Sequence, residues 1–275
     1  MLGKAAGSTF INLPGNELNS FPIPLPPLSE QKRIAALLNE QMAAVERARK
    51  AAEECLAAVN ELPAAYLRAV FPAPDQPLPD GWRWVKLGEV CEIVSGTTPK
   101  SGTPEYWNGE IVWITPTDLG KLRHRYITDS ERRISKAGFD SCNLTMLPVG
   151  SVVLSSRAPI GHLGIVTVPL CTNQGCKTFV PGDALESEFL YHAMKRSVWD
   201  LQQMGSGATF AEVSKTQLEG FEIPLPPLSE QKRIAALLNE QMAAVERARK
   251  AAEEELEAIN RLPAALLRRA FAGEL

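Results

Sequence analysis

The sequence FPIPLPPLSEQKRIAALLNEQMAAVERARKAAEE occupies residues 21–54, and it returns at residues 221–254 with a single change, Pro22 to Glu222. The two copies start 200 residues apart. Solenoid repeats recur every few tens of residues, so this spacing is not that of a solenoid. The chain therefore predicts a duplicated module that flanks a different domain.

Each copy predicts a long helix behind an extended lead-in. The three prolines within residues 24–27 fix φ and keep the lead-in extended. Ser29 is a suitable N-cap, and Glu30 places a carboxylate at the positive end of the helix dipole. Strong helix formers dominate the remainder of each copy. About 40 residues at 1.5 Å each predict a rod on the order of 60 Å, with kinks at Pro63 and Pro263.

Apolar or small residues recur along both copies in steps of three and four, which is the period of a coiled coil. The alternative is one amphipathic helix on a globular core, but the stretch is long and rich in Ala. The predicted seam comprises Ile34, Leu38, Gln41, Val45, Ala48, Ala52, Cys55, Val59, Leu62 and Tyr66 in the first copy. In the second copy it comprises Ile234, Leu238, Gln241, Val245, Ala248, Ala252, Glu255, Ile259, Leu262 and Leu266.

The composition is that of an ordinary soluble protein. The 275 residues carry a net charge of −3, with 22% charged and 45% hydrophobic residues. There is no apolar run long enough to cross a membrane and no secretory signal. Five irregularly spaced cysteines predict reduced thiols in a cytoplasmic protein. Ligand spacing for zinc is absent, and we expect neither a metal nor a cofactor.

Between the two helices the pattern changes to short β-branched runs separated by Gly, Pro and Asn turns, which predicts a mostly β domain over residues 72–220. The predicted strands are WRWVKL, CEIVSG, EIVWIT, SVVLSS, LGIVTV and KTFVP. One helix is predicted over residues 187–204. The expected fold class is therefore α+β, with a mostly β domain and two long antiparallel coiled-coil helices.

Several motifs carry a resemblance to a known family. They are PDGW…LGEV (residues 79–90), VSGTTP (94–99), IVWITPTDL (111–119), LPVGSVVLSSRAPIG (147–161), TNQGC (172–176), GSGATF (205–210), and IPLPPLSEQKRIAALL in both copies. The chain resembles the specificity subunit of a Type I restriction-modification system. That family carries two target-recognition domains, each followed by a spacer helix, so the chain resembles a half-length form with one complete recognition domain.

The resemblance implies four segments. Residues 1–20 are the remnant of a preceding recognition domain, because GSTFINLPGNELNS (7–20) aligns with GATFAEVSKTQLEG (207–220). Residues 21–71 form the first spacer helix, 72–220 the target-recognition domain, and 221–275 the second spacer helix. The resemblance also implies a non-catalytic reader of double-stranded DNA that binds methyltransferase subunits and a restriction subunit, while those subunits carry the adenine-N6 methylation chemistry.

Candidate DNA contacts are inferred from side-chain chemistry. The densest basic stretch, residues 121–136, can neutralise phosphates, although a solvated loop is the alternative. Asn and Gln can bind adenine, Arg guanine and Asp a cytosine amino group, but a turn-stabilising role is an equal alternative for these loop residues. The candidates are Thr97, Thr98, Lys100, Asp118, Lys121, Arg123, Arg125, Arg132, Arg133, Lys136, Arg157, Asn173, Gln174 and Lys177. Trp82, Trp84 and Trp113 are expected in the core.

Sequence motifs of nucleotide binding, methyl transfer, metalloproteases and serine hydrolases are absent, which favours a non-catalytic role. Two other interpretations stay open, a coiled-coil protein-interaction scaffold and a silent recombination cassette for specificity switching. The charged face of the repeat is the expected methyltransferase contact, through Glu40, Glu46, Arg47, Arg49 and Lys50. One domain reads few base pairs, so we expect a homodimer that reads an interrupted palindrome.

Overall fold

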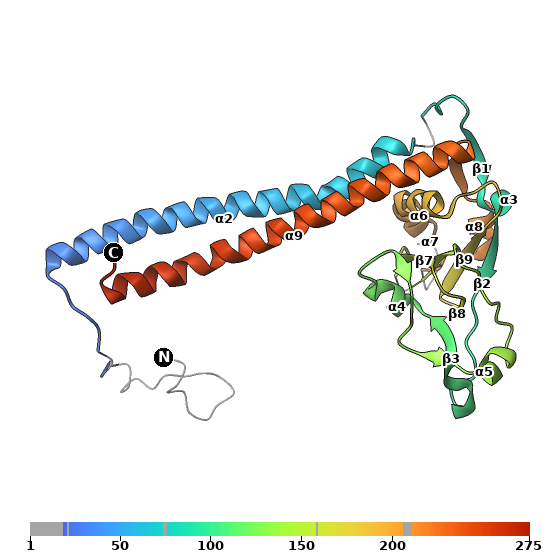
Figure 1. Cartoon of the computed structure of the whole chain (residues 1–275), viewed down its shortest axis with the longest axis horizontal. Helices are drawn as coiled ribbons and strands as arrows, with labels where there is room; N and C mark the ends of the chain where they lie inside the picture. The colour runs from blue at the N-terminus through green and yellow to red at the C-terminus, as the bar shows by residue number, and fades with distance from the viewer. Residues whose placement is uncertain (1–18, 21, 74–75, 158, 206–210) are drawn as a thin grey trace. The chain divides into compact units, whose positions relative to one another are not determined.

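The computed structural model describes residues 19–20, 22–73, 76–157, 159–205 and 211–275 (Figure 1). The chain divides into two compact units, one made of residues 1–59 and 248–275 and the other of residues 60–247. The predicted α+β class is confirmed. Two long helices, α2 (Leu28–Val70) and α9 (Leu228–Ala272), each contribute to both units.

In the first unit, α2 and α9 run in opposite directions. The guanidinium of Arg33, near the start of α2, donates a 2.6 Å hydrogen bond to the backbone oxygen of Leu275, just after α9. Ala52 and Ala252 are buried. Small side chains at these positions let the helices approach closely.

The predicted seam is right in one row of residues and wrong by one position in the other. Leu38, Val45 and Val59 are buried at least in part, as expected, but Ala48 and Cys55 are exposed. The half-buried residues Arg49 and Leu56 take their places, and the same shift occurs at residues 248–249 and 255–256. Leucine offers more apolar surface than cysteine or glutamate, and an arginine stem can cover a seam while its charge stays in water. Leu262 is exposed as well.

Both long helices start one residue earlier than predicted. Each begins at the leucine of the PPLSEQ motif, and the backbone oxygen of Pro27 accepts from the amides of Glu30 and Gln31 at 2.9 and 3.0 Å. Ser29 therefore lies inside the first turn, and the prediction that it is the N-cap is wrong. The side chain of Gln31 donates to the oxygen of Pro26 instead, at 2.8 Å. Pro63 lies inside α2, which continues to Val70.

The second unit contains three sheets in the part of the chain that is described. The largest has the order β2-β9-β6-β7-β4, the next β5-β3-β8, and the smallest β1-β10. The strands are β1 (Arg83–Lys86), β2 (Cys91–Ser95), β3 (Trp107–Ile114), β4 (Tyr126–Ile127), β5 (Arg133–Ile134), β6 (Val152–Ser155), β7 (Leu163–Val166), β8 (Leu170–Thr172), β9 (Cys176–Pro181) and β10 (Glu222–Leu225). All six strands predicted from the β-branched runs are present.

Short helices connect and cover these strands. They are α3 (Leu87–Val90), η1 (Pro104–Tyr106), α4 (Pro116–Lys121), α5 (Lys136–Asp140), α6 (Ser187–Arg196), α7 (Val198–Gly205) and α8 (Lys215–Glu219). The single helix predicted over residues 187–204 is wrong, because it divides at Ser197. The amide of Ser197 bonds to the oxygens of both Ala193 and Met194, at 3.1 Å each, and this closes α6 before α7 begins.

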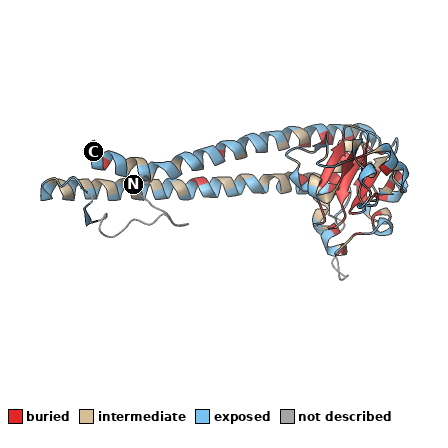
Figure 2. Cartoon of the chain, turned by 90° about the horizontal axis from the view of Figure 1, so that it is seen from below, coloured by how far each residue is buried: buried red, intermediate tan, exposed pale blue. Residues whose placement is uncertain are grey.

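The core of the second unit joins the sheets to the helices. Its largest cluster packs Phe71, Phe179 and Phe189 with the first turns of α9, where Ile234 and Leu238 are buried. Figure 2 shows the buried residues gathered in the strands, whereas the long helices are mostly exposed or half-buried. Trp113 is 2% exposed, which confirms its predicted place in the core.

Candidate nucleic-acid interface

Three loops of the large sheet converge because of its strand order. The antiparallel pairing of β2 with β9 places Ser95 opposite Lys177, and the pairing of β6 with β9 places Ser155 opposite Cys176. The ends of β2 and β6 and the beginning of β9 therefore meet at one edge. The loops after β2, after β6 and before β9 start from that edge.

The second sheet ends at the same place. Parallel strands β3 and β8 pair Ile114 with Thr172, their last residues. The amide of Thr97 donates to the oxygen of Thr172 and the amide of Asn173 donates to that of Ile114, each at 2.9 Å. Gly96 permits this approach, because a Cβ there would collide with the backbone oxygen of Asn173.

Five polar side chains form a connected set on these loops, which we call the loop-end cluster: Thr98, Arg157, Gln174, Lys177 and Glu212. The Thr98 hydroxyl donates to the Gln174 side-chain oxygen. The Lys177 ammonium lies 3.5 Å from the Gln174 backbone oxygen and 3.5 Å from the Glu212 carboxylate. The Arg157 guanidinium lies 3.7 Å from the same carboxylate.

The charge of the cluster is positive, since two cations share one carboxylate. The side chain of Lys177 is only 8% exposed, while those of Arg157 and Glu212 are exposed by 38% and 37%. A nearly buried ammonium depends on its anionic partner. Beside it, burial raises the pKa of the Cys176 thiol to about 12, so this thiol is neutral and adds no negative charge.

Glu212 is the member that sequence reasoning missed. It lies just after the GSGATF motif, of which only Gly205 is among the described residues. Its backbone forms an isolated antiparallel bridge with Arg157, so the pairing is set by a contact between distant segments. The other four members were predicted, and the fold brings them together.

Three of the predicted contacts instead stabilise the loops. Asp118 accepts from the amide of Thr115 at 2.9 Å, in a capping box at the start of α4, and its other oxygen accepts from the amide of Glu131 at 2.9 Å. The side chain of Asn173 accepts from the amide of Gly175 at 2.9 Å. The hydroxyl of Thr97 donates to the oxygen of Asn143 at 3.3 Å.

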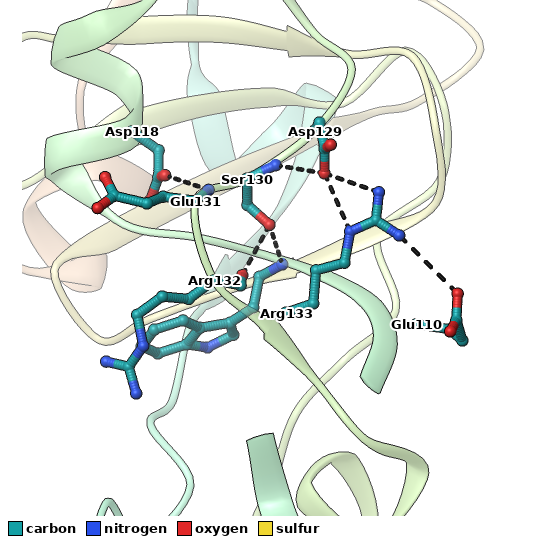
Figure 3. A network of polar contacts seen from close by, with 8 residues as sticks. Glu110, Asp118, Asp129, Ser130, Glu131, Arg132 and Arg133 are labelled. Atoms are coloured by element: carbon teal, nitrogen blue, oxygen red, sulfur yellow. Dashed lines mark hydrogen bonds and ion pairs between the residues drawn. The ribbon is translucent and has the colours of Figure 1, made fainter. Parts of the chain in front are cut away.

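Most cations of the basic 121–136 segment are paired with carboxylates, as Figure 3 shows for Arg133. Its guanidinium lies 2.9 Å from Asp129 and 3.9 Å from Glu110. The other ion pairs of the segment are Lys121 with Glu131, Arg125 with Glu188 at 2.8 Å, and Lys136 with Asp140. Hydrogen bonds from Ser130 and Arg133 hold the pKa of the Asp129 carboxyl below its usual value, so this anion persists.

Two arginines of the segment differ from the others. Arg132 stacks its guanidinium over the ring of Trp107 at 3.8 Å and near that of Trp113 at 5.7 Å. In Figure 3 its head lies beyond the indole rather than against the neighbouring carboxylates. Arg123 is exposed and has no ion pair among the described residues. Lys100 is exposed in the loop after β2 and likewise has no ion pair there.

The expected methyltransferase contacts lie on the exposed side of α2. Glu46 pairs with Arg49 at 2.5 Å, and Lys50 pairs with Glu54 at 4.0 Å. Glu40 and Arg47 are exposed. Exposed helical ion pairs contribute little to stability, about 0.3–0.5 kcal/mol each, so these side chains are free to exchange partners.

Over the residues that are described, no cluster of three or more His, Cys, Asp or Glu side chains has the arrangement of a metal site. No described helix is both long enough and apolar enough to span a membrane. The described part of the chain thus offers a polar loop surface rather than a metal centre.

Comparison with known proteins gives this α+β architecture its class. The family model described as the Type I restriction modification DNA specificity domain matches residues 1–53 and 79–257. The chain belongs to this family, and the resemblance found in its sequence is confirmed. Its match to residues 1–53 includes the first copy of the repeat, and its match to 79–257 includes the second.

Two curated relatives illustrate the similarity. The chain is 38% identical to the Type I restriction enzyme MjaIX specificity subunit of Methanocaldococcus jannaschii, over 59% of this chain and 38% of the relative. It is 28% identical to the EcoR124I/EcoR124II specificity subunit of Escherichia coli, over 57% of this chain and 40% of that relative. The chain thus spans about two fifths of the length of these relatives.

Solved structures agree on the fold. The crystal structure of the HsdS subunit from Thermoanaerobacter tengcongensis matches all of the chain and 66% of its own length, with a TM-score of 0.70 and 32% identity. A structure described as the basis of complex assembly and conformational transition of the type I R-M system matches 98% of the chain and 66% of its own, with a TM-score of 0.81 and 33% identity.

Proposed function

We propose that the chain is a non-catalytic, sequence-specific DNA-binding subunit that directs an adenine-N6 methyltransferase and restriction complex to a bipartite site in the cytoplasm. The observation that carries this proposal is the loop-end cluster. It gathers an amide, a hydroxyl and two cations from separate loops of one domain. Gln174 can bind adenine in two places, and Arg157 can bind guanine in the same way.

The segment boundaries form part of the proposal. Residues 72–220 act as the target-recognition domain, and residues 21–71 and 221–275 act as the spacers. Residues 1–18, expected to be the remnant of another recognition domain, lie outside the described residues. The core supports a close link between domain and spacer, because Leu67 of α2 and Ile234 of α9 are buried in the same cluster as the strands.

The recognition domain binds DNA, whereas the helices bind the methyltransferase. Two segments with almost the same surface sequence favour two equivalent docking places for one kind of subunit. Glu40, Glu46, Arg47, Arg49 and Lys50, with their counterparts in the second copy, are the contacts we infer. A restriction subunit is the further partner that membership of the family suggests.

The working unit in this proposal is a homodimer. A single domain reads only a few base pairs, and each mismatch costs roughly 1–3 kcal/mol, so two domains are needed to mark rare sites. Two-fold symmetry makes the half-sites inverted copies of each other. Sedimentation at micromolar concentration tests this part directly. A dimer is expected, and a monomer would contradict it without touching the DNA-reading role.

The alternative is a protein-interaction scaffold that uses its apolar helical surface. Binding to a DNA duplex between about 50 and 200 mM salt separates the two functions. A reader loses affinity steeply over this range, because bound phosphates release counterions. A chain that binds no duplex at 50 mM salt, while keeping its folded circular dichroism spectrum, would reject the DNA-reading function.

A further inference from the structure

The two copies of the repeat have the same sequence but different surroundings. Ile23 and Leu25 are 66% and 77% exposed, whereas their counterparts Ile223 and Leu225 are 0% and 4% exposed. The difference continues into the helices, where Ile34 and Leu38 are half-buried but Ile234 and Leu238 are 3% and 0% exposed. The second copy therefore shows what this sequence does when it is covered.

In the second copy the cover begins with a strand. β10 pairs antiparallel with β1, with Ile223 opposite Val85 and Leu225 opposite Arg83. The side chains of Ile223 and Leu225 belong to the same core as Phe189 of α6. The one difference between the copies, Pro22 for Glu222, falls on the first residue of this strand, where proline is tolerated.

Polar contacts complete the cover. The side chain of Gln231 accepts from the amide of Glu186 at 2.8 Å and donates to the oxygen of Ala184 at 2.9 Å. Asn239 bonds to the ring of His192 on α6 at 2.8 Å. In the first copy, Gln31 makes only its local bond to Pro26 among the described residues. Its carbonyl oxygen and the side chain of Asn39 thus have no corresponding partners there.

The uncovered first copy borders an apolar groove of about 590 Å³ within the first unit. Leu25, Ile34 and Leu38 line it from the first copy, and Ala270 and Phe271 line it from the end of α9. Phe271 is itself 62% exposed. The groove combines apolar side chains that would be stabilised by burial with a backbone segment able to pair as a strand.

We propose that this groove docks a recognition domain of the same fold whose β1-type strand and α6-type helix are not covered by a segment of their own chain. Such a domain brings a strand edge for residues 22–25, an apolar face for Ile23 and Leu25, and a loop amide and oxygen for Gln31. A second copy of this chain does not offer that face, because its own β10 and α9 already occupy it. The docking is thus separate from the proposed homodimer.

The experiment uses two full-length chains. The acceptor carries I23D, L25D, I223D and L225D, which vacates its recognition-domain face and disables its first copy. The donor is the wild-type chain, and the matched control donor carries I23D and L25D alone. Native mass spectrometry should show a 1:1 donor–acceptor complex, at least about a hundredfold weaker with the control donor, because a buried carboxylate without a partner is costly. Equal binding of both donors would overturn the proposal.

Hydrogen exchange on the wild-type chain gives an answer even if the acceptor does not fold. Residues 23–38 and 223–238 have the same sequence, so their protection can be compared directly. We expect the second segment to exchange far more slowly than the first, and the first to gain protection when a vacant domain is added. Equal protection in the wild-type chain alone would mean that the first copy is already covered, which would overturn the proposal while leaving the DNA-reading function intact.

Discussion

The ammonium of Lys177 lies 3.5 Å from the carboxylate of Glu212, although the lysine side chain is only 8% exposed. Arg157 reaches the same carboxylate from another loop, at 3.7 Å. Glu212 therefore offsets two cations at the place where the loops of both sheets meet. A negative charge inside a DNA-reading surface lowers its affinity for any phosphate, so it restrains binding to unrelated DNA.

Replacing Glu212 by Gln should raise the affinity for random duplex DNA and steepen its dependence on salt, because two cations are released toward phosphates. Fluorescence anisotropy at several salt concentrations measures both quantities. Glu219→Gln is the matched control, since Glu219 pairs with Lys215 on α8 at 3.7 Å, outside the loop-end cluster. Unchanged binding in E212Q would remove the cluster from the DNA surface.

Gln174→Ala should weaken binding to the cognate site and leave random DNA unaffected. A bidentate amide–adenine pair contributes about 1–3 kcal/mol of discrimination, which corresponds to roughly 5–150-fold in affinity. Lys100→Ala is the contrasting variant, because an exposed lysine without an ion pair should weaken all sequences alike. A Q174A variant that loses affinity equally for cognate and random duplexes would assign Gln174 to the backbone.

The arginines of the 121–136 segment should not behave alike. Arg123→Ala should lower the salt slope by about one unit, as expected for one lost phosphate contact. Arg133→Ala should leave the slope nearly unchanged, because Arg133 already pairs with Asp129. Both variants keep their helical content in this account. Equal slopes for R123A and the wild type would place Arg123 on ordinary surface.

The stability of the second unit should fall as the pH drops from about 7 toward 5. Burial lowers the pKa of His192, with a smaller effect of Arg125, while the bond to Asn239 and the charge of Glu188 oppose this. The unfolded chain therefore takes up a proton near the ordinary histidine pKa that the folded chain does not, and stability is lost below it. Thermal unfolding of His192→Gln should lack this pH dependence. A parallel loss in both proteins would assign the effect to other groups.

Periodicity and turn chemistry were enough to predict the long helices, the six main strands and the boundary near residue 72. The phase of the seam was not, because adjacent positions such as Ala48 and Arg49 differ little in their fit to the repeat. Loop positions for Thr98, Arg157, Gln174 and Lys177 could be inferred from their chemistry. Their union through Glu212 could not, since it depends on strand order and on a bridge between residues 157 and 212.

The exposure of the first copy was equally invisible in the sequence, because identical letters stand at Ile23 and Ile223. Burial of a repeat depends on what packs against it rather than on the repeat itself. The ion pairs of Lys121, Arg133 and Lys136 are another case. Counting basic residues overstated the charge available for DNA, because carboxylates close in space neutralise them.

Methylation mapping tests the central claim most directly. Genomic DNA is taken from cells that contain this chain and its methyltransferase but no other specificity subunit. The account predicts methylated adenines in one interrupted palindrome, with the two half-sites as inverted copies of each other. A methylated site whose halves are unrelated, or methylation that does not depend on this chain, would contradict it.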